Sequence, residues 1–172
     1  MKRPTSSLVI ALATAAIALA AAVAPASVAA SDGQSGLAAL RAATAAFHDV
    51  HAAEAAGYAS FYVCTAEPGQ GAMGQHFVNG SLLGTLDPTK PQALVYEPTA
   101  NGYKLVAVEF VVIAAGWDET HGAPPALFGQ TFGRVDAPNR YGLPDFYELH
   151  VWAWKPNPSG MFYEWNPRVS CP

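Results

Sequence analysis

The sequence predicts an α+β fold, in which an N-terminal helix packs on a mostly antiparallel, twisted sheet of five to six strands. Three observations lead to this prediction. An amphipathic pattern with steps of three and four residues comes first and ends near Gly57. Short runs rich in Val, Phe, Tyr and Trp, separated by Gly and Pro, fill the rest of the chain. The two cysteines, Cys64 and Cys171, are suited to a single disulfide.

Residues 1–30 have the pattern of a secretory signal peptide. Two basic residues precede an apolar, alanine-rich stretch at 8–23, and small residues lead to a cleavage site after Ala30. The apolar stretch is short for a membrane span, and Pro25 interrupts it. We therefore expect a secreted, extracellular protein in which residues 31–172 form a single globular domain, with no membrane attachment after cleavage.

The charge of the chain argues against a nucleic-acid partner. The formal net charge is −4, and loss of Lys2 and Arg3 with the signal peptide makes it −6. The remaining basic residues are scattered, so they form no patch for a phosphate backbone. The composition does not indicate which small ligand or protein partner the protein binds.

The cysteines indicate the compartment and a covalent restraint. Outside the cytosol an even number of cysteines favours a disulfide, so Cys64 and Cys171 are expected to pair. On the chain-entropy model a bond that closes a loop of about a hundred residues contributes roughly 4–5 kcal/mol. The alternative is a metal-binding pair of thiols, but the chain has no CxxC spacing.

The elements follow from local patterns. Residues 31–35 are expected to form a flexible start that caps the helix, which then runs to about residue 56, with Gly57 just beyond its end. Loops are expected at 69–74 and 138–144, where Gly and Pro gather. The expected strands are 61–64, 76–79, 93–97, 104–113, 128–135 and 147–155.

Two ionisable groups lie where apolar side chains are expected. The run KLVAVEFVVI is apolar from its second residue onward except for Glu109. A carboxylate in such a covered strand must be protonated, hydrogen-bonded, or paired with a cation or a metal. In the strand near the C-terminus, alternation places His150 on one face with Trp152 and Trp154.

Two histidines and one carboxylate on neighbouring strands can form a facial triad for a divalent metal ion. Our candidate ligands are His76, Glu109 and His150, and the candidates for a fourth or supporting position are His48, His51 and Glu97. No HxH or HExxH spacing supports the geometry. A buried His–Glu pair that only orders the sheet is therefore the alternative.

A second interpretation is an apolar pocket near the C-terminus. The turn NPSG reverses the chain after His150, so later aromatic residues can fold back over the strand. The candidate lining is Trp152, Trp154, Phe162 and Trp165. An ordinary aromatic core is the alternative explanation of these residues.

The motifs GAMGQHFVN, PQALVYEP, LVAVEFVV, FGQTF and LHVWAWKPNPSGMFYEWNPRVSC span most of residues 47–171. Together they resemble a family of uncharacterised small secreted proteins of high-GC bacteria that carry signal peptides. The resemblance implies a secreted single-domain protein with GxMGxH and LHxWxWxxNPxGMF motifs, here containing His76 and His150. It implies no activity, cofactor or catalytic residue.

These observations leave three functions open. The first is a secreted protein that binds a divalent metal ion or a small polar ligand at a partly buried His/Glu site. The second is a hydrolase-like or lyase-like enzyme, with Glu109 as a general base of raised pKa beside His150. The third is an extracellular interaction or structural domain without a catalytic site, in which the buried His and Glu are merely hydrogen-bonded.

Overall fold

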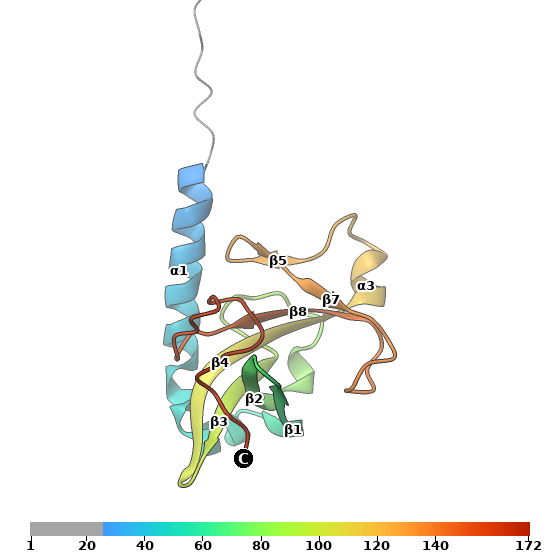
Figure 1. Ribbon diagram of the computed structural model, residues 1–172. Helices are drawn as coiled ribbons and strands as arrows, with labels where there is room; N and C mark the ends of the chain where they lie inside the picture. The colour runs from blue at the N-terminus through green and yellow to red at the C-terminus, as the bar shows by residue number, and fades with distance from the viewer. Residues whose placement is uncertain (1–25) are drawn as a thin grey trace, which may run out of the picture.

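The computed structural model describes residues 26–172, and Figure 1 shows the predicted α+β architecture. Within these residues, helices at the N-terminal end pack beside a curled antiparallel sheet of six strands. Most of the expected signal peptide lies outside the described residues, and its last residues begin helix α1 (Ala26–Thr44). None of the described helices has the length and apolar character that crossing a membrane requires.

The helical segment differs from the expected single helix. α1 already includes residues 31–35, which are helical rather than a flexible start, because the alanine-rich residues before them favour a helix. A short 3-10 helix, η1 (Ala45–His48), then interrupts the segment. Asp49 begins α2 (Val50–Ala55) as its N-cap, since its carboxylate accepts a hydrogen bond from a backbone N–H in the first turn.

The end of α2 confirms the expected role of Gly57. This residue has a φ of 91°, in the left-handed region that glycine adopts readily. Its N–H donates to the carbonyl of Glu54, and the N–H of Tyr58 donates to the carbonyl of Ala53. These two bonds are those of a Schellman motif, which ends a helix and turns the chain towards the next strand.

The strands of the main sheet lie in the order β1-β2-β3-β4-β8-β7, and all neighbours are antiparallel. Their bounds are β1 (Ala59–Glu67), β2 (Gly71–Val78), β3 (Ala93–Thr99), β4 (Gly102–Ile113), β7 (Gly133–Val135) and β8 (Phe146–Val151). A separate hairpin pairs β5 (Ala126–Leu127) with β6 (Gln130–Thr131). The short helices η2 (Gly80–Leu82) and α3 (Ala114–Asp118) lie in connections.

Two expected boundaries are wrong for a backbone reason. The expected strand 128–135 is divided, because Phe128 and Gly129 have φ values of 54° and 73° and turn the chain between β5 and β6. The expected loop 69–74 instead contains the start of β2. Gly71 is required there because a Cβ would overlap the carbonyl oxygen of Asn166 on the C-terminal segment.

The sheet has two different faces. The helices cover one face, where Leu40 of α1 packs in the main apolar cluster with residues such as Phe110 and Val151. The other face carries a smaller apolar cluster that includes Val95, Trp152 and Val169. Covered on both sides, β4 has the nearly continuous apolar sequence that its burial demands.

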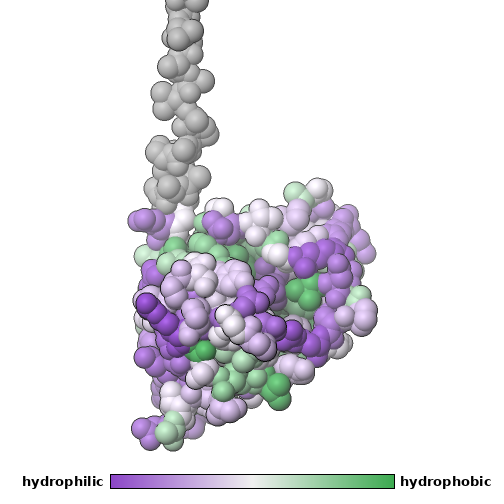
Figure 2. Space-filling view, viewed as in Figure 1, coloured by the Kyte–Doolittle hydropathy of each residue, from purple (hydrophilic) through white to green (hydrophobic). Residues whose placement is uncertain are grey.

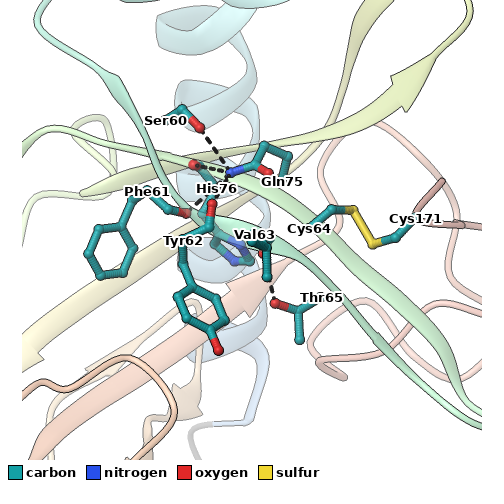
Figure 3. The surroundings of a disulfide bond; sticks show 9 residues. All are labelled: Ser60, Phe61, Tyr62, Val63, Cys64, Thr65, Gln75, His76 and Cys171. Carbon is teal, nitrogen blue, oxygen red and sulfur yellow. Dashed lines mark hydrogen bonds between the residues drawn. A yellow bond between two sulfur atoms is a disulfide. The ribbon is translucent and has the colours of Figure 1, made fainter.

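The predicted disulfide between Cys64 and Cys171 is confirmed, with a Cα–Cα distance of 5.6 Å. It joins β1 to the C-terminal segment (Figure 3). β1 is an edge strand, and its pairing with β2 shifts register between Phe61 and Thr65. The side-chain amide of Gln75 donates to the carbonyls of Phe61 and Tyr62, so it secures the irregular part of β1 beside His76.

Candidate functional site

The register of the sheet brings the three predicted ligands to one face. Glu109 of β4 lies directly opposite His150 of β8, and on its other side it lies opposite Ala93 of β3. His76 of β2 pairs with Val95, two residues further along β3. Because alternate residues of a strand share a face, His76, Glu109 and His150 all project from the face that the helices leave free.

The side chains of this trio converge. The Nε2 atom of His76 lies 3.1 Å from a carboxylate oxygen of Glu109, and the rings of His76 and His150 have centroids 6.0 Å apart. One donor atom from each residue lies within 4.8 Å of the other two. The exposed fractions are 7% for His76, 8% for Glu109 and 1% for His150, so the group is almost closed to solvent.

His150 is the least satisfied member. Both of its ring nitrogens are buried, and neither has a hydrogen-bond partner among the described residues. Its ring packs against Trp152 at a centroid distance of 4.7 Å. Burial lowers the pKa of His150 to about 4, and the repulsion of His76 acts in the same direction, whereas Glu109 opposes it. His150 is therefore a neutral imidazole with an unused lone pair, which is a costly arrangement unless something binds it.

Glu109 is ionised despite its surroundings. Burial alone would raise its pKa, but the attraction and hydrogen bond of His76, the attraction of His150 and a hydrogen bond from Glu148 outweigh burial and lower the pKa to about 2. The enzymatic hypothesis required a raised pKa at this carboxyl group. The lowered pKa of Glu109 therefore does not suit a general base that works at neutral pH.

Glu148 is a site residue that the sequence reasoning missed. It is buried on β8, two residues from His150 on the same face. Burial and then the charge of Glu109 raise the pKa of Glu148 to about 10, and Glu164 acts in the same direction. Glu109 and Glu148 therefore share one proton at neutral pH. The alternation of the motif ELH already placed Glu148 beside His150, and this was the signal that could have identified it.

Two cavities approach the trio from different sides. One, of about 150 Å³, has mostly apolar walls and is lined by His76, Glu109 and Glu148 at its polar end. The other, of about 310 Å³, is more polar and reaches Glu148 and His150. The second cavity is also lined by the segment from Phe162 to Trp165.

The four aromatic residues of the expected pocket do not form one lining. Phe162 and Trp165 line the larger cavity with His150, as the chain reversal predicted. Trp152 packs in the small cluster behind them. Trp154 lies on the other side, where its Nε1–H donates to Thr44 of α1, because β8 ends at Val151 and the strand alternation stops.

The three residues expected to support the metal ligands lie elsewhere. His48 is exposed and its ring contacts Trp154, with centroids 4.4 Å apart. His51 is exposed and hydrogen-bonds Glu54 within α2. Glu97 forms an ion pair with Lys155 at 2.7 Å. The helical segment packs on the opposite face of the sheet, so neither histidine reaches the trio.

The chain matches no family model, no curated protein and no solved structure. The chemistry of the site therefore follows from its own geometry. Two imidazoles and one carboxylate form a donor set suited to Zn²⁺, Fe²⁺ or Cu²⁺. In a tetrahedral site with bonds of about 2.1 Å the donors lie about 3.4 Å apart. In the observed group the donor atoms lie within 4.8 Å of one another, so the side chains would have to move closer together to bind an ion.

Proposed function

We propose that this protein binds one divalent transition-metal ion through His76, Glu109 and His150. The observation that carries the proposal is His150, whose two buried nitrogens have no partner among the described residues although a carboxylate and a second imidazole lie beside it. A metal ion would accept the lone pair of the unprotonated nitrogen of His150, and it would offset the negative charge of Glu109. Binding would require no deprotonation of His150 or Glu109 near neutral pH, since burial and charge already hold both in the form that binds metal.

We propose further that binding takes place outside the cytosol. The disulfide supports an oxidising compartment. The basic start, apolar stretch and small residues of the N-terminal sequence support export. Mass spectrometry of the protein recovered from culture medium tests this directly, and the mature chain is expected to begin at Ser31.

The structural alternative has less support. In that alternative the buried histidines and Glu109 only form hydrogen bonds. This agrees with the contact between His76 and Glu109, but not with His150, whose nitrogens have no partner among the described residues. A residue kept only for stability would gain a partner or be replaced by an apolar side chain, because an unsatisfied buried polar group lowers stability.

Replacing His150 separates these alternatives. We expect the wild-type protein to bind one equivalent of metal, and His150→Leu to weaken binding at least a hundredfold, measured by titration with Zn²⁺ and Co²⁺ and by elemental analysis. Metal-free His150→Leu is expected to be as stable as the wild type or more stable, because the substitution removes unsatisfied buried nitrogens without opening a large cavity.

The matched control is His51→Leu, which removes an exposed imidazole far from the trio. It is expected to retain full metal binding. If the wild type showed no bound metal and no thermal shift with zinc, copper, iron or manganese, the proposed function would be wrong.

The pH dependence gives a second test. Because protons compete with the metal for the imidazole nitrogen of His150, whose pKa is about 4, we expect the affinity to fall about tenfold between pH 5 and pH 3. Competition titrations with a chromophoric chelator, corrected for the chelator's own protonation, measure this change. An affinity that stays constant over this range would argue against histidine ligands.

A further inference from the structure

The smaller cavity is a separate feature of the same face. It has a volume of about 150 Å³, and at one end it is bounded by His76, Glu109 and Glu148. The apolar lining comes from β1, β2, β4, β8 and two connections, and consists of Phe61, Val78, Leu83, Val111, Ile113, Tyr141, Leu143 and Phe146. Such a combination of apolar walls and a few convergent polar groups is typical of small-molecule sites.

The cavity is reached from the surface and has an aromatic wall. Leu83, which lines it, is 41% exposed, so the cavity opens to solvent on that side. Tyr141 contacts both Phe61 and Phe146, with ring centroids 6.4 Å and 6.1 Å apart. On the face seen in Figure 2, strongly hydrophobic side chains lie in a recess framed by hydrophilic ones, so apolar surface is concentrated in small areas.

The irregular part of β1 forms one side of the cavity. Tyr62 has a φ of 60°, a conformation that non-glycine residues rarely adopt, and its ring contacts Tyr141 from the outside. Phe61, the preceding residue, lines the cavity. Figure 3 shows this segment beside His76, where the disulfide and Gln75 hold it in position. The wall is thus built on a restrained strand.

Size and charge limit the occupant. A cavity of about 150 Å³ accommodates one molecule the size of benzene. The carboxylate of Glu109 already contacts the imidazole of His76 at 3.1 Å, so a charged head group would find no free counter-charge in this apolar cavity. A hydroxyl group both donates and accepts, so it can bond the carboxylate and the imidazole without adding charge.

We propose that this cavity binds a small phenol, with one six-membered ring against the aromatic wall and its hydroxyl group directed at His76 and Glu109. The site does not depend on the metal, although a hydroxyl group in this position would also lie beside a bound ion. The proposal therefore extends beyond the proposed function and can fail or succeed separately from it.

The experiment compares ligands of equal size on the full mature protein. Phenol, toluene, benzoate and benzylammonium are titrated into chelator-treated and metal-loaded protein, and binding is measured by calorimetry and ligand-observed NMR. We expect one phenol per chain in the chelator-treated protein, bound at least tenfold more tightly than each of the other three. Equal binding of toluene, tighter binding of benzylammonium or benzoate, or no binding of phenol would each overturn the proposal.

Variants test the location. Val111→Phe places a larger side chain into the cavity, and it is expected to weaken phenol binding at least tenfold while metal binding is retained. The matched control is Val63→Phe, at a position that is 64% exposed on β1, and it should bind phenol as the wild type does. Leu143→Trp fills the cavity from the loop 138–144 and serves if Val111→Phe is not folded. Unchanged phenol affinity in a folded cavity-filling variant would overturn the proposal, whereas loss of metal binding alone would concern only the metal site.

Discussion

Replacing both cysteines by serine is expected to lower the free energy of unfolding by about 5 kcal/mol, because the bond between Cys64 and Cys171 closes a loop with a sequence separation of 107 residues. The bond restricts the unfolded chain, so its loss favours unfolding. A domain of this size has a total stability of about 5–15 kcal/mol, so the effect is a large fraction of the whole. Urea denaturation followed by tryptophan fluorescence measures it.

The reduced wild-type protein is the control for this variant. A reducing agent is expected to destabilise the wild type by the same amount and to leave the double serine variant unchanged. Because the disulfide also anchors β1 beside His76, hydrogen exchange should show faster opening of β1 than of β4 in the variant. A variant within about 1 kcal/mol of the wild type would contradict the chain-entropy account.

Replacing Glu148 by Gln is expected to raise the stability of the metal-free protein at neutral and alkaline pH. The pKa of Glu148 is raised to about 10 in the folded protein, from an ordinary value of 4.5. Below pH 4.5 both states keep the proton; above it the unfolded state releases the proton and the folded state does not, so wild-type stability falls as pH rises towards 10. At pH 7 the accumulated loss is on the order of 3 kcal/mol.

Glutamine has no proton to lose, and its amide can donate to both neighbouring carboxylates. We therefore expect a flatter stability profile in Glu148→Gln, measured by urea denaturation from pH 5 to pH 9 in the presence of a chelator. Glu119→Gln, at an exposed position after α3, is the matched control and should follow the wild-type profile. Parallel profiles for Glu148→Gln and the wild type would show that the buried pair does not share a proton.

Two members of the trio, Glu109 and His150, could be predicted because each violates a local pattern. An acidic residue in an apolar strand and an imidazole among large apolar residues need a partner, and that need can be read without knowing the register. The registers of β2, β3, β4 and β8 then brought the three side chains together. His48 and His51 were also predicted to support the site, but both lie on an exposed part of the helical segment.

The surroundings of Trp154 and Glu148 could not be predicted from local sequence patterns. Alternation continues only while the strand continues, and β8 ends at Val151, so Trp154 turns to the helix side. Glu148 had the correct face in the sequence, but its shared proton depends on Glu109 and Glu164, which come from other parts of the chain. No pattern within one strand contains that information.

The sequence by itself determined the α+β class, the pairing of Cys64 with Cys171 and the need of Glu109 and His150 for a partner, because hydrophobic periodicity and the chemistry of buried polar groups act locally. Only the tertiary structure decided which groups meet, which carboxyl group keeps its proton and where a cavity remains. Those properties depend on register and chain reversal, which bring together residues that are distant in the sequence.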